Sequence, residues 1–370
     1  MDKSKWEYKK LGEVCDLYQP KTISSDMLVP DGKYLVYGAN GVIGKYNKYN
    51  HENSEVLMTC RGATCGTINV SAPYSWINGN AMVVHPRTID LNAQYLVYQL
   101  KAADKTSVIT GAAQPQITRQ MLQTLPFVVA PITDQQRIVA ELDCLNEMIA
   151  LKQGQLKEFD KLAQSIFYDM FGDPVENTKG WKQCLLKDVT SIITDGDHMP
   201  PPKSETGVPF VTISNVDKEA GLIDFSDTFF VPQEYYDNIP DNKKPHVGDI
   251  LYTVTGSYGI PILIKDDKAF CFQRHIGLIR PISEINPVFM CLWAGCQPVK
   301  RYADRVATGV AQKTVSLKAL RNFPIILPPL ALQQQFAEKI QAIEAQKELV
   351  KQSIAETQQL LDSRMDYYFD

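Results

Sequence analysis

The stretch over residues 133–171, TDQQRIVAELDCLNEMIALKQGQLKEFDKLAQSIFYDMF, decides the fold of this chain. Its apolar residues recur at alternating steps of four and three residues, and only Lys152 interrupts the row. Such an a/d seam, kept over several heptads, is typical of a helix that packs lengthwise on another helix. Thr133 with Gln136 predicts a capping box at the start, and Gly172 predicts the end. The helix would be roughly 55–60 Å long.

The partner of this helix is predicted in the same chain. Residues 110–136, TGAAQPQITRQMLQTLPFVVAPITDQQ, align without a gap on residues 308–334, TGVAQKTVSLKALRNFPIILPPLALQQ. The same offset of 198 carries the first apolar row onto a second. The predicted seam residues are Ile138, Leu142, Leu145, Ile149, Leu156, Phe159 and Ile166 in the first helix, and Phe336, Ile340, Ile343, Val350, Ile354 and Leu361 in the second. The chain is therefore a duplicated unit, and we expect a pseudo-two-fold molecule with antiparallel paired helices.

In each copy, the sequence before the long helix predicts a globular α+β part. β-like runs separated by glycine and asparagine turns occupy residues 34–46, 55–70 and 81–86 in the first copy, and 209–216, 249–264 and 275–281 in the second. Helical stretches follow at 93–103 and 287–296. The second copy carries about 23 extra residues in its middle, where we expect loops. The predicted segments are 1–132, 133–171, 172–330 and 331–370.

Composition and charge narrow the class of protein. The 370 residues suffice for two domains, no apolar run approaches the roughly 20 residues that span a bilayer, and the N-terminal residues MDKSKWEYKK show no secretory signal. The eight cysteines form no CxxC pair, which favours free thiols in the cytoplasm. The net charge of −4 is concentrated on the two helices, at −3 each, while residues 1–132 carry +3. Any nucleic-acid surface must therefore be local.

The ordered, doubled motifs resemble the DNA specificity subunit of type I restriction–modification enzymes over essentially the whole chain. They are a tryptophan followed by a short apolar segment, E/D-[IV]-L-x-T before a Gly-rich turn, TG-x-AQ, L-x3-P-x4-P, and QQ before a long helix. The segment SIFYDMFGDP (165–174) also looks like the first conserved region of that family. The resemblance implies two target-recognition domains of α/β type, separated by two long antiparallel coiled-coil helices.

The resemblance also implies a function. Such a subunit is non-catalytic and binds double-stranded DNA with a bipartite target, each domain reading one half-site. It belongs to a complex with restriction endonuclease and adenine-specific DNA methyltransferase activity, in which the coiled coil docks two methyltransferase subunits and restriction subunits join. The chain itself is expected to bind no cofactor or metal and to contact no membrane. S-adenosylmethionine, ATP and Mg²⁺ are expected on the partner subunits.

Candidate DNA-contacting residues are amide, guanidinium, hydroxyl and ammonium groups on turns, because such groups read base edges and bind phosphates. In the first copy they are Asn40, Lys45, Tyr46, Arg61, Thr64, Trp76, Asn78, Asn80, Gln114, Gln116 and Arg119. In the second they are Asp195, His198, Lys203, Ser214, Asn215, Thr255, Ser257, Tyr258, Arg274, His275, Gln312, Lys313 and Thr314. The repeated TG-x-AQ segments favour shared geometry or phosphate contact, whereas the non-repeated turns favour base contact.

Other interpretations stay open at this point. A coiled-coil scaffold that does not bind DNA would share the helices and the repeats, and an inactive orphan specificity subunit would share every motif. An enzyme with a hidden site would need a nucleophile or carboxylate arranged around a residue such as His198, and the sequence shows none. The spacing of Cys60, Cys65 and His85 fits no usual zinc pattern. The Gly-rich turns lack a nucleotide-binding context.

Overall fold

The computed structural model describes residues 2–111, 113–218, 221–310 and 312–369, and the chain divides into two units. Unit 1 comprises residues 1–153 and 351–370, and unit 2 comprises residues 154–350. Helices α4 (Ile132–Phe171) and α9 (Leu330–Phe369) each pass from one unit into the other, so each unit contains part of both helices. Segments of both helices thus contribute to the core of each unit.

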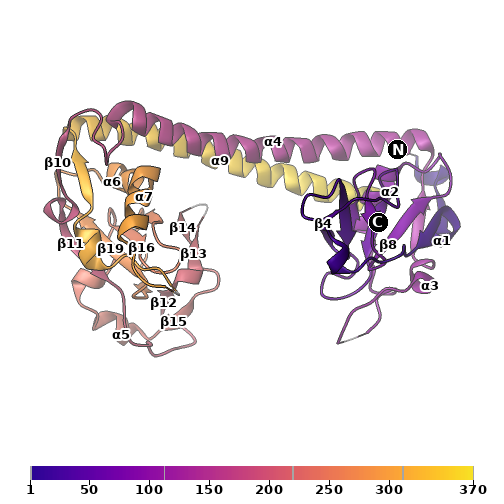
Figure 1. Ribbon diagram of the computed structural model, residues 1–370, viewed down its shortest axis with the longest axis horizontal. Coiled ribbons are helices and arrows are strands. Elements are labelled where there is room, and N and C mark those ends of the chain that lie inside the picture. The colour runs from indigo at the N-terminus through magenta and orange to yellow at the C-terminus, as the bar shows by residue number, and fades with distance from the viewer. Residues whose placement is uncertain (1, 112, 219–220, 311, 370) are drawn as a thin grey trace. The chain divides into compact units, whose positions relative to one another are not determined.

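The two units repeat the same sheet topology. Figure 1 shows the helices and strands of the chain, among them the long helices α4 and α9. Unit 1 has a four-stranded sheet in the order β2 (Cys15–Tyr18), β8 (Ala81–Pro86), β5 (Val56–Thr59) and β6 (Ile68–Val70). Its three-stranded sheet has the order β4 (Gly41–Tyr46), β3 (Tyr34–Gly38) and β7 (Trp76–Ile77), and β1 (Glu7–Lys10) pairs with β9 (Pro126–Val129).

Unit 2 matches these sheets strand for strand. Its four-stranded sheet runs β11 (Thr190–Asp195), β19 (Ile276–Pro281), β16 (Ile250–Thr253) and β17 (Pro261–Leu263). Its three-stranded sheet runs β15 (Phe229–Val231), β12 (Val208–Val211) and β18 (Cys271–Phe272), and β10 (Lys182–Leu185) pairs with β20 (Pro324–Leu327). In both three-stranded sheets the central strand pairs in parallel with the last one. The duplication predicted from the motifs is therefore confirmed at the level of strand order.

The extra residues of unit 2 are partly ordered into secondary structure. Around β15 they form the hairpin of β13 (Val216–Asp217) and β14 (Leu222–Ile223), helix α5 (Gln233–Asp237) and a 3-10 turn (Asp241–Lys243). The remaining helices are α1 (Leu11–Val14), α2 (Ala93–Ala102), α3 (Arg119–Leu122), α6 (Pro287–Gly295), α7 (Gln297–Val306) and α8 (Leu317–Arg321), and the other 3-10 turns cover Lys3–Lys5, Ser25–Met27, Leu186–Val189 and Ile213–Asn215. The prediction of loops alone was wrong, and helix α7 was not predicted.

Helices α4 and α9 pair in antiparallel fashion within each unit. In unit 1, Lys152 Nζ donates to Ser353 Oγ and Thr357 Oγ1 at 2.8 Å each, so the break in the apolar row is a satisfied polar layer. In unit 2, Lys347 Nζ lies 2.8 Å from a carboxylate oxygen of Asp160. A second contact in each unit, Glu141–Arg364 in unit 1 and Phe167–Phe336 in unit 2, shows that residue numbers rise along α4 as they fall along α9.

The predicted seam residues are buried or half-buried. In unit 1, Ile138, Leu142, Leu145 and Ile149 share one apolar cluster with Leu361, and Ile354 packs against it. In unit 2, Phe336, Ile340 and Ile343 share a cluster against which Phe159 and Ile166 pack, while Leu156 and Val350 are half-buried.

The end of α4 departs from the predicted row. Phe167 and Phe171 are almost fully buried, although the seam placed Ile166 and Met170 there. The ring centroids of both phenylalanines lie within 6 Å of those of Phe289 and Phe336. The helix therefore turns this face to the core of unit 2, and a two-helix seam no longer describes it.

The two ends of α4 can be compared with the helix start and the helix end that the sequence predicts. The predicted end is confirmed, because Gly172 takes a left-handed backbone (φ 74°) and its N–H donates to Tyr168 O at 2.9 Å. The predicted capping box is wrong. The helix begins at Ile132, because Pro131 O already accepts the N–H groups of Asp134 and Gln135 at 2.8 and 3.0 Å, and Thr133 lies inside the first turn.

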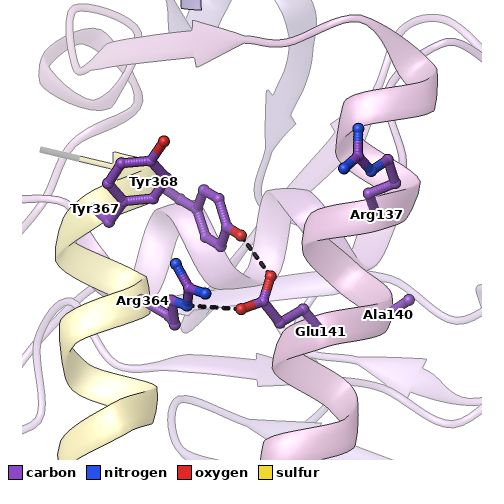
Figure 2. A pocket seen from close by; sticks show the side chains of 6 residues that line it. All are labelled: Arg137, Ala140, Glu141, Arg364, Tyr367 and Tyr368. Atoms are coloured by element: carbon purple, nitrogen blue, oxygen red, sulfur yellow. Dashed lines mark hydrogen bonds and ion pairs between the residues drawn. The ribbon is translucent and has the colours of Figure 1, made fainter. Parts of the chain in front are cut away.

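A polar cluster joins the first turns of α4 to the last turns of α9 in unit 1 (Figure 2). Glu141 accepts a hydrogen bond from the Tyr368 hydroxyl at 2.5 Å and pairs with Arg364 at 2.7 Å. Burial, and then the hydrogen bond to Glu141, raises the pKa of Tyr368 to about 12. These side chains and Arg137 line an open cavity of about 420 Å³. Arg364, at a predicted seam position, thus has a carboxylate partner.

All eight cysteines are free thiols, as predicted. Within the described part of the chain, no helix has the length and apolar content that a membrane span requires. No group of three or more His, Cys, Asp or Glu that could hold a metal ion occurs among the described residues.

Candidate DNA interface

In each unit the Gly-rich turn and the TG-x-AQ loop form one surface. In unit 1 the Gly62 N–H donates to Pro115 O at 3.0 Å, and the Ile117 N–H donates to Cys60 O at 2.9 Å. In unit 2 the Gly256 N–H donates to Lys313 O at 3.0 Å. In unit 1 these bonds bring together the predicted residues Arg61, Thr64, Gln114 and Gln116, and Arg119 follows at the start of α3. In unit 2 they bring together Thr255, Ser257, Tyr258, Gln312, Lys313 and Thr314.

Each TG-x-AQ loop is closed in the same way. Thr110 and Gln116 exchange backbone hydrogen bonds of 2.9 and 2.8 Å, and Thr308 and Thr314 exchange bonds of the same lengths. Gly111 and Gly309 have φ of 86° and 107°, which only glycine adopts without strain. A Cβ at Gly309 would also collide with the carbonyl oxygen of Gln312. The identical glycines of the two repeats therefore have a geometric cause.

Replacing Gly309 with alanine is expected to weaken duplex DNA binding about tenfold, because the loop must open to relieve the strain, of the order of 1–3 kcal/mol. The measurement is an affinity titration on duplex DNA, with the methyltransferase subunit that the sequence resemblance implies as a partner. Gly154→Ala is the control: it lies in the middle of α4, with nothing within 4 Å of the added Cβ. That control should leave DNA affinity unchanged and stabilise the helix by about 0.5–1 kcal/mol. Equal affinities of the two variants would contradict a role for the loop.

Two further turns of unit 1 adjoin this surface. The Thr59 hydroxyl donates to Ala39 O, next to Asn40, and Asn40 accepts from the Asn69 amide at 3.2 Å. The Cys60 N–H donates to Asn80 O at 3.4 Å. Asn40 and Asn80 thus lie beside the turn that carries Arg61. Lys45, Tyr46 and Trp76 lie instead on β4 and β7, where the rings of Tyr46 and Trp76 meet edge to face at 5.5 Å.

Unit 2 adds a different set of groups beside its Gly-rich turn. The Val254 N–H donates to His275 O at 2.9 Å, so His275 and the preceding Arg274 lie beside the strand end that leads into the turn. The Arg274 N–H donates to Asp197 O at 3.1 Å. Burial, and then the charge of Arg274, lowers the pKa of His275. This histidine therefore stays neutral at physiological pH, when it can both donate and accept a hydrogen bond.

The other candidates of unit 2 lie on neighbouring loops. His198 Nε2 lies 2.9 Å from Asp195 Oδ2. Ser214 is exposed and its hydroxyl lies 2.7 Å from that of Thr212. The ammonium of Lys203 lies 4.9 Å from the ring centroid of Phe229. All three are exposed. Among the described residues, none of the hydrogen bonds, ion pairs or ring contacts given for them reaches the Gly-rich turn.

Two predicted DNA-contacting residues are wrong because their side chains are buried and used by the fold. Asn78 is 3% exposed; its Oδ1 accepts the Ile23 N–H at 3.0 Å and the indole N–H of Trp76 at 3.1 Å. Asn215 is 7% exposed; its Oδ1 accepts the Thr212 N–H at 2.9 Å, and its amide donates to Asp227 O at 3.1 Å. Neither amide is free to read a base edge.

Two buried glutamines position the units on the helices, and the sequence interpretation missed them. Gln135 accepts the Asn92 N–H at 2.8 Å and donates to Asp90 O and Ala130 O. Gln333 accepts the Asn286 N–H at 2.9 Å and donates to Glu284 O and Pro328 O. Asn92 and Asn286 cap helices α2 and α6. The repeated QQ pairs were visible in the sequence, but without a structure nothing indicated that the first glutamine is buried.

A buried carboxylate also recurs below the two Gly-rich turns. In unit 2, Arg280 forms two hydrogen bonds to Asp249, at 2.9 and 2.8 Å. At the matching position of unit 1, His85 Nδ1 lies 2.8 Å from Glu55. Glu55 and Asp249 begin the repeated E/D-[IV]-L-x-T motif, so the motif's acidic residue secures the strand that leads into each turn.

Comparison with known proteins agrees with this duplicated architecture. The model of the type I restriction modification DNA specificity domain matches residues 3–160 and again residues 178–359. The chain belongs to this family.

Relatives are similar over most of their length. A putative type I specificity subunit of Mycoplasma pneumoniae is 22% identical over 342 residues, which cover 89% of this chain and 86% of the relative. The specificity subunit of the type I restriction enzyme MjaVIII from Methanocaldococcus jannaschii is 21% identical over 373 residues, covering 92% and 86%.

Solved structures share the fold. The S subunit of a type I restriction–modification system from M. genitalium superimposes with a TM-score of 0.55 at 14% identity, covering 97% of this chain and 95% of that one. A chain from a structure on complex assembly and conformational transition of the type I R-M system gives a TM-score of 0.61 at 17% identity, covering 99% and 98%. The predicted α+β fold with two similar domains and two long helices is thereby confirmed.

Proposed function

We propose that this chain is the non-catalytic recognition subunit of a cytoplasmic type I restriction–modification complex and reads a bipartite site on double-stranded DNA. The observation that carries the proposal is the doubled surface, in which each unit joins a Gly-rich turn to a closed TG-x-AQ loop. Each surface exposes guanidinium, ammonium or amide groups such as Arg61, Gln116, Arg274 and Lys313, which suit groove and phosphate contacts.

Residues 1–132 and 172–330 would act as the two readers, and the helices 133–171 and 331–370 as the spacer between them. The repeated loops suit phosphate contact, because they are the same in both units. The differing groups, Asn40 and Asn80 in unit 1 and Arg274 and His275 in unit 2, suit base contact, because two unlike half-sites need unlike readers. The helices would also dock two methyltransferase subunits, joined by restriction subunits, that bind S-adenosylmethionine, ATP and Mg²⁺.

The test is methylation mapping of the whole genome in a host that expresses this chain with its cognate methyltransferase subunit. The expected result is a split methylated motif, two short blocks separated by a fixed run of unspecified bases, that is absent from a matched host without the chain. Replacing residues 1–132 with the corresponding domain of a relative should change one block and leave the other intact.

Two outcomes would count against the proposal. If a stable complex with an active methyltransferase produces no methylation that depends on the chain, an inactive copy or a pure scaffold is the better description. If the domain replacement alters both blocks together, the two units do not read separately.

A further inference from the structure

We infer that helix α7 of unit 2 binds the DNA backbone through Lys300 and Arg305, a phosphate contact for which unit 1 has no equivalent helix. The inference rests on the proposed function, because it assigns a second element to the same DNA-binding surface. Neither residue was among the predicted DNA contacts.

Helix α7 is strongly two-sided. Val299 and Ala303 are buried in the core of unit 2. Lys300, Arg301 and Arg305 are exposed, and three cations within six residues give this face a net positive charge even with Asp304 among them. Phosphates are bound by such clusters of ammonium and guanidinium groups. Many clusters of this kind are only solvated surface. Whether this one can bind a ligand therefore depends on where helix α7 lies in unit 2.

The location is the candidate DNA surface itself. The Tyr258 hydroxyl, in the Gly-rich turn, donates to Asp304 Oδ1 at 2.7 Å. A Cβ on Gly259 of the same turn would lie 3.8 Å from Lys300 Cγ. The chain leaves α7 at Val306 and enters the TG-x-AQ loop at Thr308. Helix α7 therefore contacts one half of the surface and leads directly into the other half.

The cations have little internal compensation. Arg301 lies 4.0 Å from Asp173, at the limit of an ion pair. Over the ranges that the structure describes, Lys300 and Arg305 lie in no ion pair, and the Arg305 guanidinium lies 5.4 Å from the ring centroid of Tyr302. Asp304, the one acidic residue of the helix sequence, is engaged by Tyr258. Two cations thus remain available to a ligand that carries negative charge.

Unit 1 differs at the same point of the repeat. Between α2 and the TG-x-AQ loop it has residues 103–109, which form no helix. The cation of this segment, Lys105, donates to Ala103 O at 3.0 Å, and its pKa is lowered by burial. The ammonium is thus committed to the protein's own backbone. We therefore expect unit 2 to contribute more of the salt-dependent binding than unit 1.

The experiment measures affinity against salt concentration for the full chain assembled with its cognate methyltransferase subunit. Fluorescence anisotropy is recorded on a duplex with the mapped target and on a duplex without it. The test variant is Lys300→Gln with Arg305→Gln. The control is Lys182→Gln with Lys187→Gln, which removes the same charge from two exposed lysines on β10 and the turn after it.

Each phosphate contact contributes about 0.9 to the slope of log K against log salt, so the test variant should flatten the slope by roughly 1.8. Its affinity should fall by the same factor on both duplexes, because phosphate contacts carry no sequence information. Asp304→Asn keeps an acceptor for Tyr258 but removes the opposing charge, and it should tighten binding severalfold at low salt. Loss of fold cannot cause that gain.

A slope equal to that of the Lys182/Lys187 control, or unchanged affinity of Asp304→Asn, would overturn the inference. If thermal melting shows that the test variant is partly unfolded, the Asp304→Asn result alone decides whether the inference holds. If the parent complex binds neither duplex, the proposed function itself is wrong. Failure of the proposed function is therefore distinguishable from failure of the inference about helix α7.

Discussion

Replacing Arg280 with methionine is expected to destabilise unit 2 by about 3–5 kcal/mol, because it leaves a buried carboxylate without its cation. The Asp249 side chain is 2% exposed, and Arg280 reaches both of its oxygens. The same guanidinium donates to Lys244 O at 3.0 Å, so it also holds the end of the insertion in place. Hydrogen exchange of the β16 and β19 amides measures the loss within unit 2.

Two companion variants make this result specific. Replacing both partners, Arg280→Met with Asp249→Leu, should recover most of the stability, since well-packed apolar residues can substitute for a buried ion pair. His85→Met in unit 1 should cost less than Arg280→Met, because the His85 side chain is 48% exposed and water can solvate Glu55 in its absence. If Arg280→Met shifts the exchange of β16 no more than His85→Met does, the ion pair is not what holds the strand.

Replacing Gln333 with methionine is expected to lower the free energy of unfolding by about 2–4 kcal/mol. The Gln333 side chain is the only described hydrogen-bond partner of two backbone groups, which the substitution would leave unsatisfied. The Asn286 N–H loses its acceptor, and Pro328 O loses a donor at 2.9 Å. The variant keeps the shape of the side chain, so packing is preserved and the measured loss reports on the hydrogen bonds. Chemical denaturation, followed by hydrogen exchange at the start of α6, is the measurement.

The neighbouring glutamine provides the control. Gln334 is equally repeated in the sequence but exposed, and Gln334→Met should change stability by no more than about 0.5 kcal/mol. Gln135→Met should reproduce the loss in unit 1, since Gln135 makes the matching three bonds. Equal effects of Gln333→Met and Gln334→Met would contradict the assigned role.

The large features of the fold were predictable because they depend on periodicity. A heptad row needs only the residue types along one helix, and a gap-free repeat needs only the comparison of the chain with itself. The parallel pairing of β3 with β7 could not be predicted, because it depends on contacts between residues about 40 positions apart. The capping box failed for a related reason: Pro131 O supplies the first helical acceptors, which no side-chain signal shows.

The candidate surface was predictable as a set of turns but not residue by residue. Glycines at Gly62 and Gly256 marked the turns correctly, since left-handed backbone favours glycine. Asn78 and Asn215 are also turn-forming residues, and burial, which depends on the neighbouring strands, separates them from exposed Asn80. Helix α7 did leave a signal, because Pro298 suits a first helical turn and the charges of QPVKRYADRV lie on one face.

The discontinuity of unit 1 has a consequence for biosynthesis. Unit 2 is continuous in sequence, from residue 154 to residue 350, whereas the core of unit 1 includes Leu361 and Tyr368. The second unit can complete its core once residue 350 has left the ribosome, because it includes no part of residues 351–370. The first unit, although synthesised earlier, must keep part of its apolar surface open until α9 has emerged. N-terminal domains usually finish folding first, whereas completion of unit 1 requires residues that are synthesised after the whole of unit 2.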